Sequence, residues 1–241
     1  MFKKLTLTMI LSLTMLSTSA SAKVNVKTNQ LQPKGTELNK APKAVQNDTK
    51  AVDELVEKLQ TIKTLSANFS KTIIGSDDKD HVMSGSLLIK RPDLFIWDTK
   101  KPYSQTIYAG NGKIWNVDHS IMQVVIQNQG KDTENTPVQL LSGNARKFLQ
   151  NYSVTVEQQR AERSFTLRPL SINDTLFKSL TLHFKEGKLI GFSMLDGLGN
   201  HNKIDLENVM VNQPINDSRF KPEYPKKYDV IDKSIVREKA G

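Results

Sequence analysis

Apolar and polar side chains alternate along residues Leu87–Val125, and turn-forming residues interrupt the alternation at short intervals. Successive side chains of a β-strand point to opposite faces, so a period of two predicts a meander of short antiparallel strands. Within this stretch Phe95 and Trp97 share one face, while Leu94 and Ile96 share the other. A sheet that is apolar on both faces must be covered on both, which predicts a packed helix over one face and an apolar ligand cavity at the other.

The same alternation predicts about eleven short strands in all. Sequential hairpins join them, and Asn111-Gly112 supplies the positive φ angles that a two-residue hairpin turn needs. Such a series favours one large, strongly curved antiparallel sheet, a barrel or half-barrel with helices over its open side. The predicted strands are 66–72, 83–90, 94–99, 104–109, 114–118, 122–128, 152–159, 164–168, 176–184, 189–195 and 203–208, with a further edge strand expected within 220–232.

A helix is predicted over Asp48–Leu65, because its apolar residues recur at the 3.6-residue helical spacing. A helix that is apolar over half its circumference is expected to lie across a sheet or to cap a cavity. Shorter helices are predicted at 137–141, where Pro137 stands near the first turn, and at 144–151. The apolar positions of the first helix are Val52, Leu55, Val56, Leu59, Ile62 and Leu65.

The N-terminus has the pattern of a secretory signal peptide over residues 1–22. Lys3 and Lys4 precede an apolar run, Leu5–Leu16, and Ala20-Ser21-Ala22 forms a small-residue cleavage site. The run is shorter than the roughly 20 residues that a membrane-spanning helix needs. We therefore expect export, with cleavage after Ala22.

Residues 23–47 are rich in Lys, Asn, Gln and Pro and nearly free of large apolar residues, which predicts a disordered basic leader. Most of the formal net charge of +9 lies in the signal peptide and this leader. The folded domain, residues 48–241, is therefore not the strongly basic surface that nucleic-acid binding needs. The leader is expected to be a spacer, and the alternative is an electrostatic tether to an anionic membrane.

The sequence offers little to an enzyme or a metal site. It has no cysteine, so an acylated cysteine, a disulfide and a thiolate nucleophile are all excluded. None of the four histidines belongs to an HExxH motif, and Asp118-His119-Ser120 does not provide triad geometry because adjacent residues in a turn point apart. The acidic run Asp77–Asp80 lacks the glycine and glutamate of a calcium loop. No catalysis, metal or cofactor is expected.

An apolar surplus remains on the predicted sheet. Each of its residues alone suits an ordinary core position, but together on a curved sheet they predict an elongated apolar cavity. Burying an acyl chain is worth roughly 0.8 kcal/mol per methylene, so a protein competes with a bilayer only by enclosing much of the chain. Arg91, just before Pro92 at a strand end, is either a surface charge or a group that fastens the helices over the cavity by binding carbonyls at their ends. The surplus comprises Phe95, Trp97, Ile107, Trp115, Met122 and Val124.

Several motifs of this chain occur in one order at close spacing. Together they resemble the periplasmic outer-membrane lipoprotein carrier family, LolA, over roughly residues 49–232. No motif is specific alone, whereas the ordered set is. The motifs are Lys90-Arg91-Pro92-Asp93-Leu94-Phe95-Ile96-Trp97, Pro102, Asn111-Gly112-Lys113-Ile114-Trp115, Gln123-Val124, Thr136-Pro137 with Leu140-Leu141, and the segment Phe220–Asp232.

The resemblance implies an unclosed antiparallel half-barrel with a helical lid over a hydrophobic cavity. It implies that the chain accepts triacylated lipoproteins from an inner-membrane ABC transporter and delivers them to an outer-membrane acceptor. The gating arginine of the family corresponds to Arg91, and the following aromatic residues of its motif correspond to Phe95 and Trp97. The lid segment corresponds to Thr136, Pro137, Leu140 and Leu141.

This sequence departs from the family pattern in two places. Asn111-Gly112 replaces the usual Asp-Gly turn, and the leader is longer than usual. The acceptor shares the fold but needs an acylated cysteine, so the carrier is the better assignment. We therefore predict a soluble, monomeric periplasmic chaperone for acylated lipoproteins. A lipid-binding sensor module of the same fold is the first alternative, and a periplasmic hydrolase that depends on His119 is the second. The predicted acyl-chain cavity and lid comprise Arg91, Phe95, Trp97, Leu55, Leu59, Ile107, Trp115, Met122, Val124, Leu140 and Leu141.

Overall fold

The structure is a computed structural model that describes residues 49–75, 80–129, 140–141, 143–171 and 177–234. All of them belong to the second of the two units into which the chain divides after Gln46. The predicted signal peptide, the predicted leader, and the predicted lid residues Thr136 and Pro137 lie outside the described residues.

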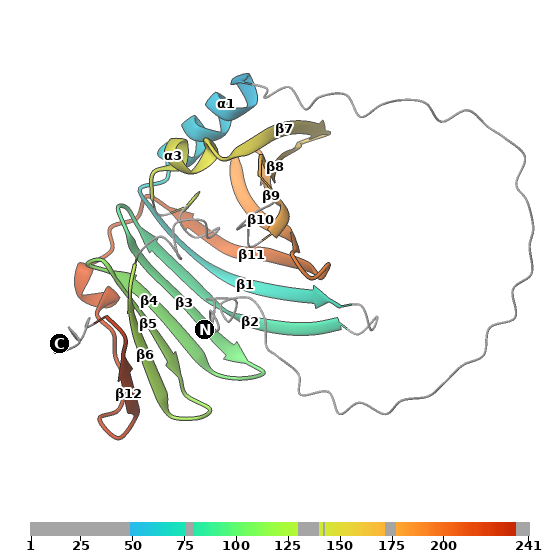
Figure 1. Cartoon of the computed structure of the whole chain (residues 1–241). Coiled ribbons are helices and arrows are strands. Elements are labelled where there is room, and N and C mark those ends of the chain that lie inside the picture. The colour runs from blue at the N-terminus through green and yellow to red at the C-terminus, as the bar shows by residue number, and fades with distance from the viewer. Residues whose placement is uncertain (1–48, 76–79, 130–139, 142, 172–176, 235–241) are drawn as a thin grey trace, which may run out of the picture. The chain divides into compact units, whose positions relative to one another are not determined.

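One sheet of twelve strands dominates the described residues (Figure 1). The strands are β1 (Thr64–Ile74), β2 (Asp80–Lys90), β3 (Leu94–Lys101), β4 (Gln105–Gly110), β5 (Lys113–Asp118), β6 (Gln123–Asn128), β7 (Tyr152–Gln159), β8 (Glu162–Pro169), β9 (Phe177–Lys185), β10 (Lys188–Asp196), β11 (His201–Val211) and β12 (Asp229–Asp232). They are ordered β12-β6-β5-β4-β3-β2-β1-β11-β10-β9-β8-β7.

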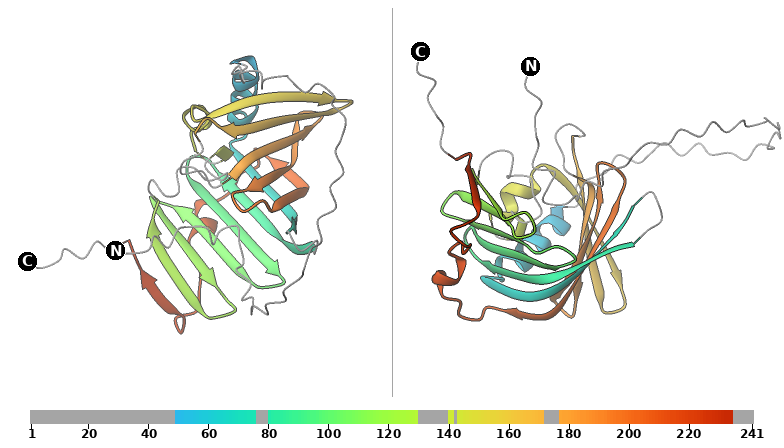
Figure 2. Two further views of the ribbon diagram at one scale, coloured as in Figure 1. Left: turned by 45° about the vertical axis from the view of Figure 1, so that its right-hand side comes forward. Right: turned by 90° about the horizontal axis from the view of Figure 1, so that it is seen from below.

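The predicted fold class is confirmed. The described residues form an open, mainly antiparallel sheet with β12 and β7 at its two ends, and the sheet curves strongly (Figure 2). Among the strands that the structure describes, the one parallel pair is β12 with β6. This pairing departs from the predicted antiparallel meander. The segment after β11 runs back across the sheet before it reaches the edge, so β12 lies beside β6 in the same direction.

Two helices, α1 (Thr49–Gln60) and α3 (Ala145–Leu149), lie on the inner side of the curved sheet (Figure 2). Leu140 and Leu141 also have helical backbone and are buried. The predicted helix over Asp48–Leu65 is wrong at its C-terminal end, because Leu65 belongs to β1 and pairs with Ile89 of β2.

Tertiary contacts with Asn212 mark the end of α1. Its side-chain amide donates to the carbonyl of Thr61 at 2.9 Å, and its side-chain oxygen accepts from the backbone N–H of Lys63 at 2.8 Å. A residue far along the sequence thus satisfies backbone groups that a continuing helix would have paired internally.

The strand register divides the side chains between an inner and an outer face. Directly paired residues of neighbouring strands share a face, so Leu87, Trp97 and Ile107 lie together on the inner face. Phe69 of β1 and Phe192 of β10 lie on this face as well, since their rings contact Trp97. The inner apolar surface, as the term is used below, comprises Phe69, Leu87, Phe95, Trp97, Ile107, Phe192, Ile204 and Leu206.

The C-terminal segment covers part of the outer face. A short 3₁₀ helix, η2 (Asp217–Phe220), contacts β3 and β4, and Phe220 is buried. Lys90 holds the start of this segment by donating to the carbonyl of Ile215 at 2.8 Å. The C-terminal segment therefore provides, on the outer face, the cover that a sheet apolar on both faces requires.

No helix among the described residues is long and apolar enough to cross a membrane.

Candidate functional site

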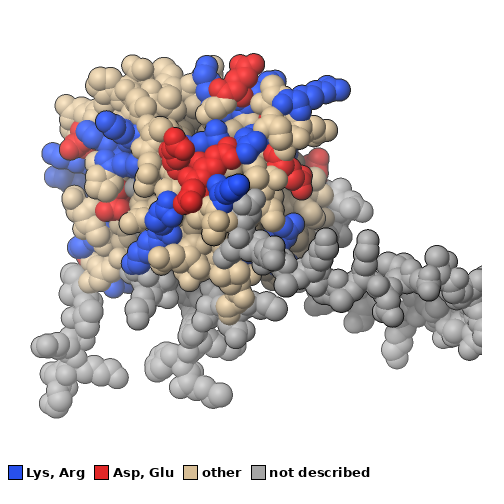
Figure 3. Space-filling model, turned by 90° about the horizontal axis from the view of Figure 1, so that it is seen from above, with Lys and Arg blue, Asp and Glu red and all other residues tan. Residues whose placement is uncertain are grey.

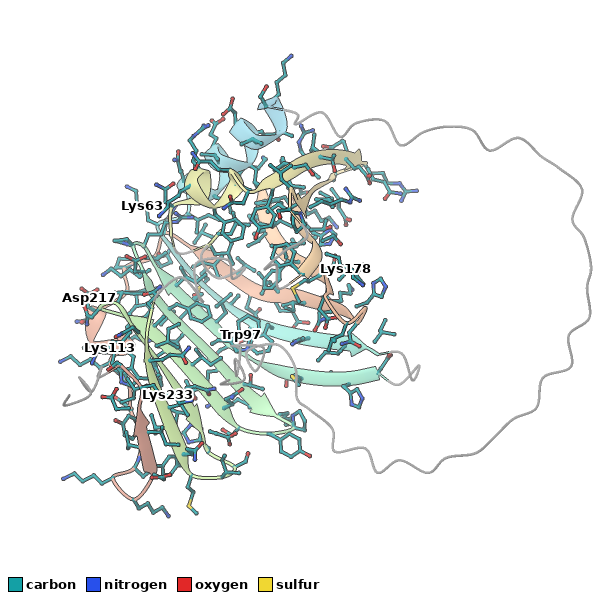
Figure 4. All side chains as sticks on the ribbon, viewed as in Figure 1. Lys63, Trp97, Lys113, Lys178, Asp217 and Lys233 are labelled. Carbon is teal, nitrogen blue, oxygen red and sulfur yellow. The ribbon has the colours of Figure 1, made fainter. Side chains whose placement is uncertain are left out.

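Aromatic rings form the centre of the inner apolar surface. Phe69 and Trp97 stack with ring centroids 4.1 Å apart, and Phe192 lies with its centroid 6.4 Å from that of Trp97. Figure 4 places Trp97 near the middle of the sheet. Trp97 is only half-buried, and its indole N–H donates to the Oγ1 of Thr99 at 3.2 Å. A large apolar ring with a satisfied polar atom is suited to contact with an apolar ligand.

Helix α1 covers part of the inner side of the sheet. Its residues Leu55 and Leu59 are completely buried, at 0% exposure. Lys58 of the same helix lies over the ring of Phe184 on β9, with its ammonium nitrogen 5.7 Å from the ring centroid. Each leucine of this kind contributes about 1.5–3 kcal/mol when it leaves water, so the helix stays on the sheet unless another apolar body replaces it.

Ion pairs hold α1 at its margins. Asp53 pairs with Arg146 of α3 at 2.8 Å, and Glu54 pairs with Arg163 of β8. These groups are partly or largely exposed, so each pair is worth little on its own. On the face seen from above in Figure 3, acidic and basic side chains are interspersed, and neither sign forms one large patch.

Arg91 lies in the turn between β2 and β3 and reaches the segment next to α3. Its Nη1 donates to the carbonyl of Gly143 at 2.6 Å, and its Nη2 contacts the carbonyl of Leu140 at 3.4 Å. Its Nε is buried without a hydrogen-bond partner, and burial lowers the pKa of the guanidinium from its ordinary value. The side chain therefore joins the sheet to the helical segment through hydrogen bonds to carbonyls, at a cost in desolvation that a surface arginine does not have.

The structure brings together most of the predicted site residues. Phe95, Trp97 and Ile107 lie on the inner face, while Leu55 and Leu59 lie on the helix that covers this side. Leu140 and Leu141 are buried, and the Leu140 carbonyl contacts Arg91. The cavity that these residues were expected to line stays a prediction.

Three predicted site residues lie away from the inner face. Trp115 pairs with Tyr108, whose neighbour Ile107 faces inward, so Trp115 faces outward. Val124 belongs to an outer-face cluster with Val117 and Ile126, against which Trp115, Tyr224 and Tyr228 pack. Met122 stands in the β5–β6 loop at 48% exposure. A strand's alternation defines two faces but does not say which face of the next strand it matches.

Two pockets of the described residues have a mixed lining. One, of about 290 Å³, lies between the sheet and the C-terminal segment and is lined by Leu88, Ile96 and Tyr108 together with the charged residues Arg219, Lys221 and Glu223. The other, of about 470 Å³, is lined by Phe69 together with serines and charged residues of β1–β3 and with Glu207 of β11. Neither offers the uniformly apolar lining that acyl chains need.

His119 has a structural environment. Its Nε2 lies 3.2 Å from the Oγ1 of Thr106 and its Nδ1 lies 3.0 Å from the hydroxyl of Tyr228. Both ring nitrogens therefore have partners, and the contacts tie the C-terminal segment to β4 and the β5–β6 loop. Among the described residues, no group of three or more acidic or histidine side chains is placed to hold a metal ion.

Two buried polar side chains on the inner face were missing from the predicted site. Lys71 of β1 is 5% exposed, and desolvation lowers its pKa from 10.5 to about 8, with Asp196 opposing the shift. Asn202 of β11 is 1% exposed, and its side-chain oxygen has no hydrogen-bond partner. The alternation of Ala67, Phe69 and Lys71 was the sequence signal that places the lysine on the apolar face.

Comparisons of the sequence with known proteins identify relatives of this chain. The family model described as outer membrane lipoprotein carrier protein LolA matches residues 60–223. The outer-membrane lipoprotein carrier protein of Pseudomonas fluorescens is 35% identical over 76% of this chain and 89% of its own length. That of Hahella chejuensis is 36% identical over 75% of this chain and 87% of its own. A crystal structure of a LolA superfamily protein from Nitrosomonas europaea covers 71% of this chain and 97% of its own, at 14% identity and a TM-score of 0.43.

Proposed function

The chain belongs to the outer membrane lipoprotein carrier family LolA, and on that premise we propose that it binds the acyl chains of lipoproteins and carries them to the outer membrane. The observation that carries this proposal is the contact of Arg91 with the carbonyls of Gly143 and Leu140, which ties the helical cover to a sheet with an apolar inner face. The apolar contacts of the cover can be exchanged for those of a ligand, and the inner apolar surface that the cover leaves suits a fatty chain.

On ligand binding, an acyl chain replaces the helical cover on the inner apolar surface. When α1 and the segment around Leu140 move away, Trp97 and its neighbours lose their cover. An acyl chain that takes its place gains roughly 0.8 kcal/mol per methylene removed from water. The hydrogen bonds of Arg91 oppose opening, with a contribution of about 1.5–3 kcal/mol for bonds that involve a charged group. Arg91 thus sets how readily the empty protein opens and how completely it closes again after unloading.

No covalent change is part of this proposal. Binding alone moves a ligand only toward tighter partners. Loading then requires a partner that supplies energy, for which an inner-membrane ABC transporter is the proposed source. Unloading requires an acceptor at the outer membrane that binds the acyl chains more tightly. We propose further that the protein works in the periplasm as a monomer, after removal of residues 1–22, with residues 23–47 as a spacer.

Native mass spectrometry of protein purified from the periplasm tests the proposal directly. We expect a fraction of the protein to carry an acylated lipoprotein. A lipid without a protein moiety would favour the sensor module over the carrier, and a consistently empty protein would contradict both.

The Arg91→Leu variant tests the role of Arg91. We expect it to retain cargo, because the closed state that competes with the acyl chain is weakened, and to cycle poorly. The control is Arg168→Leu, since Arg168 is an exposed arginine on β8. If Arg91→Leu loads and unloads as the control does, Arg91 has no such role.

A further inference from the structure

Three loops lie side by side at one end of the sheet, along the lower edge of Figure 1. They are the β3–β4 loop (102–104), the β5–β6 loop (119–122) and the loop that precedes β12 (221–228). The backbone N–H of His119 donates to the carbonyl of Ser104 at 3.0 Å, which joins the first two loops. The N–H of Asp229 donates to the carbonyl of Met122 at 2.9 Å, which joins the second to the third. The three loops therefore form one continuous surface.

Large apolar side chains on this surface point into solvent. Tyr103 is 57% exposed, Ile121 is 63% exposed and Met122 is 48% exposed. Each belongs to a loop whose backbone is fixed by the sheet, so the exposure is a property of the fold. Exposed apolar residues that gather at one place mark a contact site more often than isolated ones do.

Exposed lysines stand on these loops or directly beside them. Lys101 stands two residues before Tyr103, and Lys226 and Lys227 lie in the loop that Asp229 joins to Met122. All three lysines are exposed. Of the nearby acidic residues, Asp118 accepts from the backbone N–H groups of Ser120 and Ile121, and Asp98 pairs with Lys100. Asp229 is exposed. Lys221 and Glu223 of the third loop offset each other, and both line the pocket beside Tyr108. The three lysines Lys101, Lys226 and Lys227 then stand against the carboxylates of Asp118 and Asp229, which leaves a small excess of positive charge.

We propose that this tip surface, made of Lys101, Tyr103, Ile121, Met122, Lys226 and Lys227, binds the surface of an anionic phospholipid bilayer. The apolar side chains would enter the boundary between headgroups and acyl chains, and the lysines would lie among the phosphates. The residues stand on three projecting loops rather than in a groove, and their lysines complement the charge of a bilayer rich in anionic lipid. The proposal goes beyond the carriage of lipoproteins, because it assigns a membrane contact to loop residues at the end of the sheet, none of which belongs to the inner apolar surface.

Vesicle flotation tests the proposal with the exported chain, from Lys23 onward. One set of vesicles contains phosphatidylcholine alone, and the other contains equal parts of phosphatidylcholine and phosphatidylglycerol. We expect the protein to float with the second set only, and to be released as salt is raised. The doubles Lys226→Gln/Lys227→Gln and Ile121→Ser/Met122→Ser should each lower the partition coefficient about tenfold.

Matched variants control for charge, apolarity and the basic residues near the N-terminus. Lys185→Gln/Lys188→Gln removes two exposed lysines from the β9–β10 hairpin. That hairpin is separated from the tip surface by β11, β1 and β2 in the sheet. Leu170→Ser/Met210→Ser removes two apolar side chains that are 57% and 56% exposed. Residues 23–47 are the same in every variant. Controls that float like the unaltered protein, with tip variants that do not, support the proposal. It is overturned if the protein ignores anionic vesicles, or if tip and control variants float alike.

Discussion

The rings of Phe69 and Trp97 stack across β2, with centroids 4.1 Å apart, at the position where β2 has Gly85. A Cβ at Gly85 would overlap the carbonyl oxygen of Asp98 and would lie 2.9 Å from the ring of Phe69. The stack at the centre of the inner apolar surface therefore depends on the missing side chain between its two strands. Three strands, β1, β2 and β3, thus pack closely around Gly85, where only glycine fits without displacing its neighbours.

Gly85→Ala should destabilise the protein by about 3 kcal/mol, because the added methyl group meets backbone that cannot move without breaking the β2–β3 ladder. Gly197→Ala is the control, since a Cβ there meets nothing within 4 Å. Urea unfolding followed by circular dichroism measures both. Equal stability of the two variants would contradict the packing described for Gly85.

The two tryptophans of the chain report on opposite faces of the sheet. In Trp115→Phe the remaining fluorescence comes from Trp97, and a brominated fatty acid should quench it strongly, because quenching by bromine requires close approach. In Trp97→Phe the remaining fluorescence comes from Trp115, which packs in the outer-face cluster and should be quenched weakly. The reverse result would place the acyl chain on the outer face.

Hydrogen exchange should show what Arg91 stabilises. In Arg91→Leu the amides of residues 143–149 are expected to exchange about ten- to a hundredfold faster than in the unaltered protein, as the loss of charge-assisted hydrogen bonds predicts. Amides in the centres of β9 and β10 should not change. Arg168→Leu serves as the control, and similar exchange in the two variants would show that Arg91 does not hold this segment.

Stability should rise with pH above about 8 because of Lys71. Its folded-state pKa of about 8 lies below the ordinary 10.5, so below pH 8 both states bind the proton and the folded state bears the cost of the buried charge. Between about 8 and 10.5 the folded state has released the proton and the unfolded state has not, so that cost is relieved. The full effect is about 3 kcal/mol.

Lys71→Met isolates this contribution. The variant should be more stable than the unaltered protein at neutral pH, and the difference should shrink as pH approaches 9.5. Urea unfolding between pH 7 and 9.5 measures the difference in stability between the two proteins. Tyr152, whose pKa burial raises to about 12, contributes little in this range, because it stays mostly protonated in both states. A difference that does not vary with pH would contradict the lowered pKa.

Local patterns in the sequence determined much of the architecture. Alternation predicted all but the last strand nearly to their ends, and for β7, Tyr152–Gln159, the prediction was complete. The Asn111-Gly112 turn adopts the positive φ angles of 51° and 72° that its residue types favour. These features are predictable because strand periodicity and turn chemistry depend on residues that are neighbours in the chain.

The tertiary structure decided which of these local units meet. Alternation places Trp97 and Ile96 on opposite faces of their strand, and it does the same for Trp115 and Ile114. Only the register, which pairs Trp115 with Tyr108, shows that the two tryptophans lie on opposite faces of the sheet. Likewise, the spacing of Ile62 and Leu65 fits a continuing helix, and Asn212 ends that helix from across the fold. Register and caps of this kind are set by contacts between distant residues. Their energies depend on positions in space that no local pattern contains.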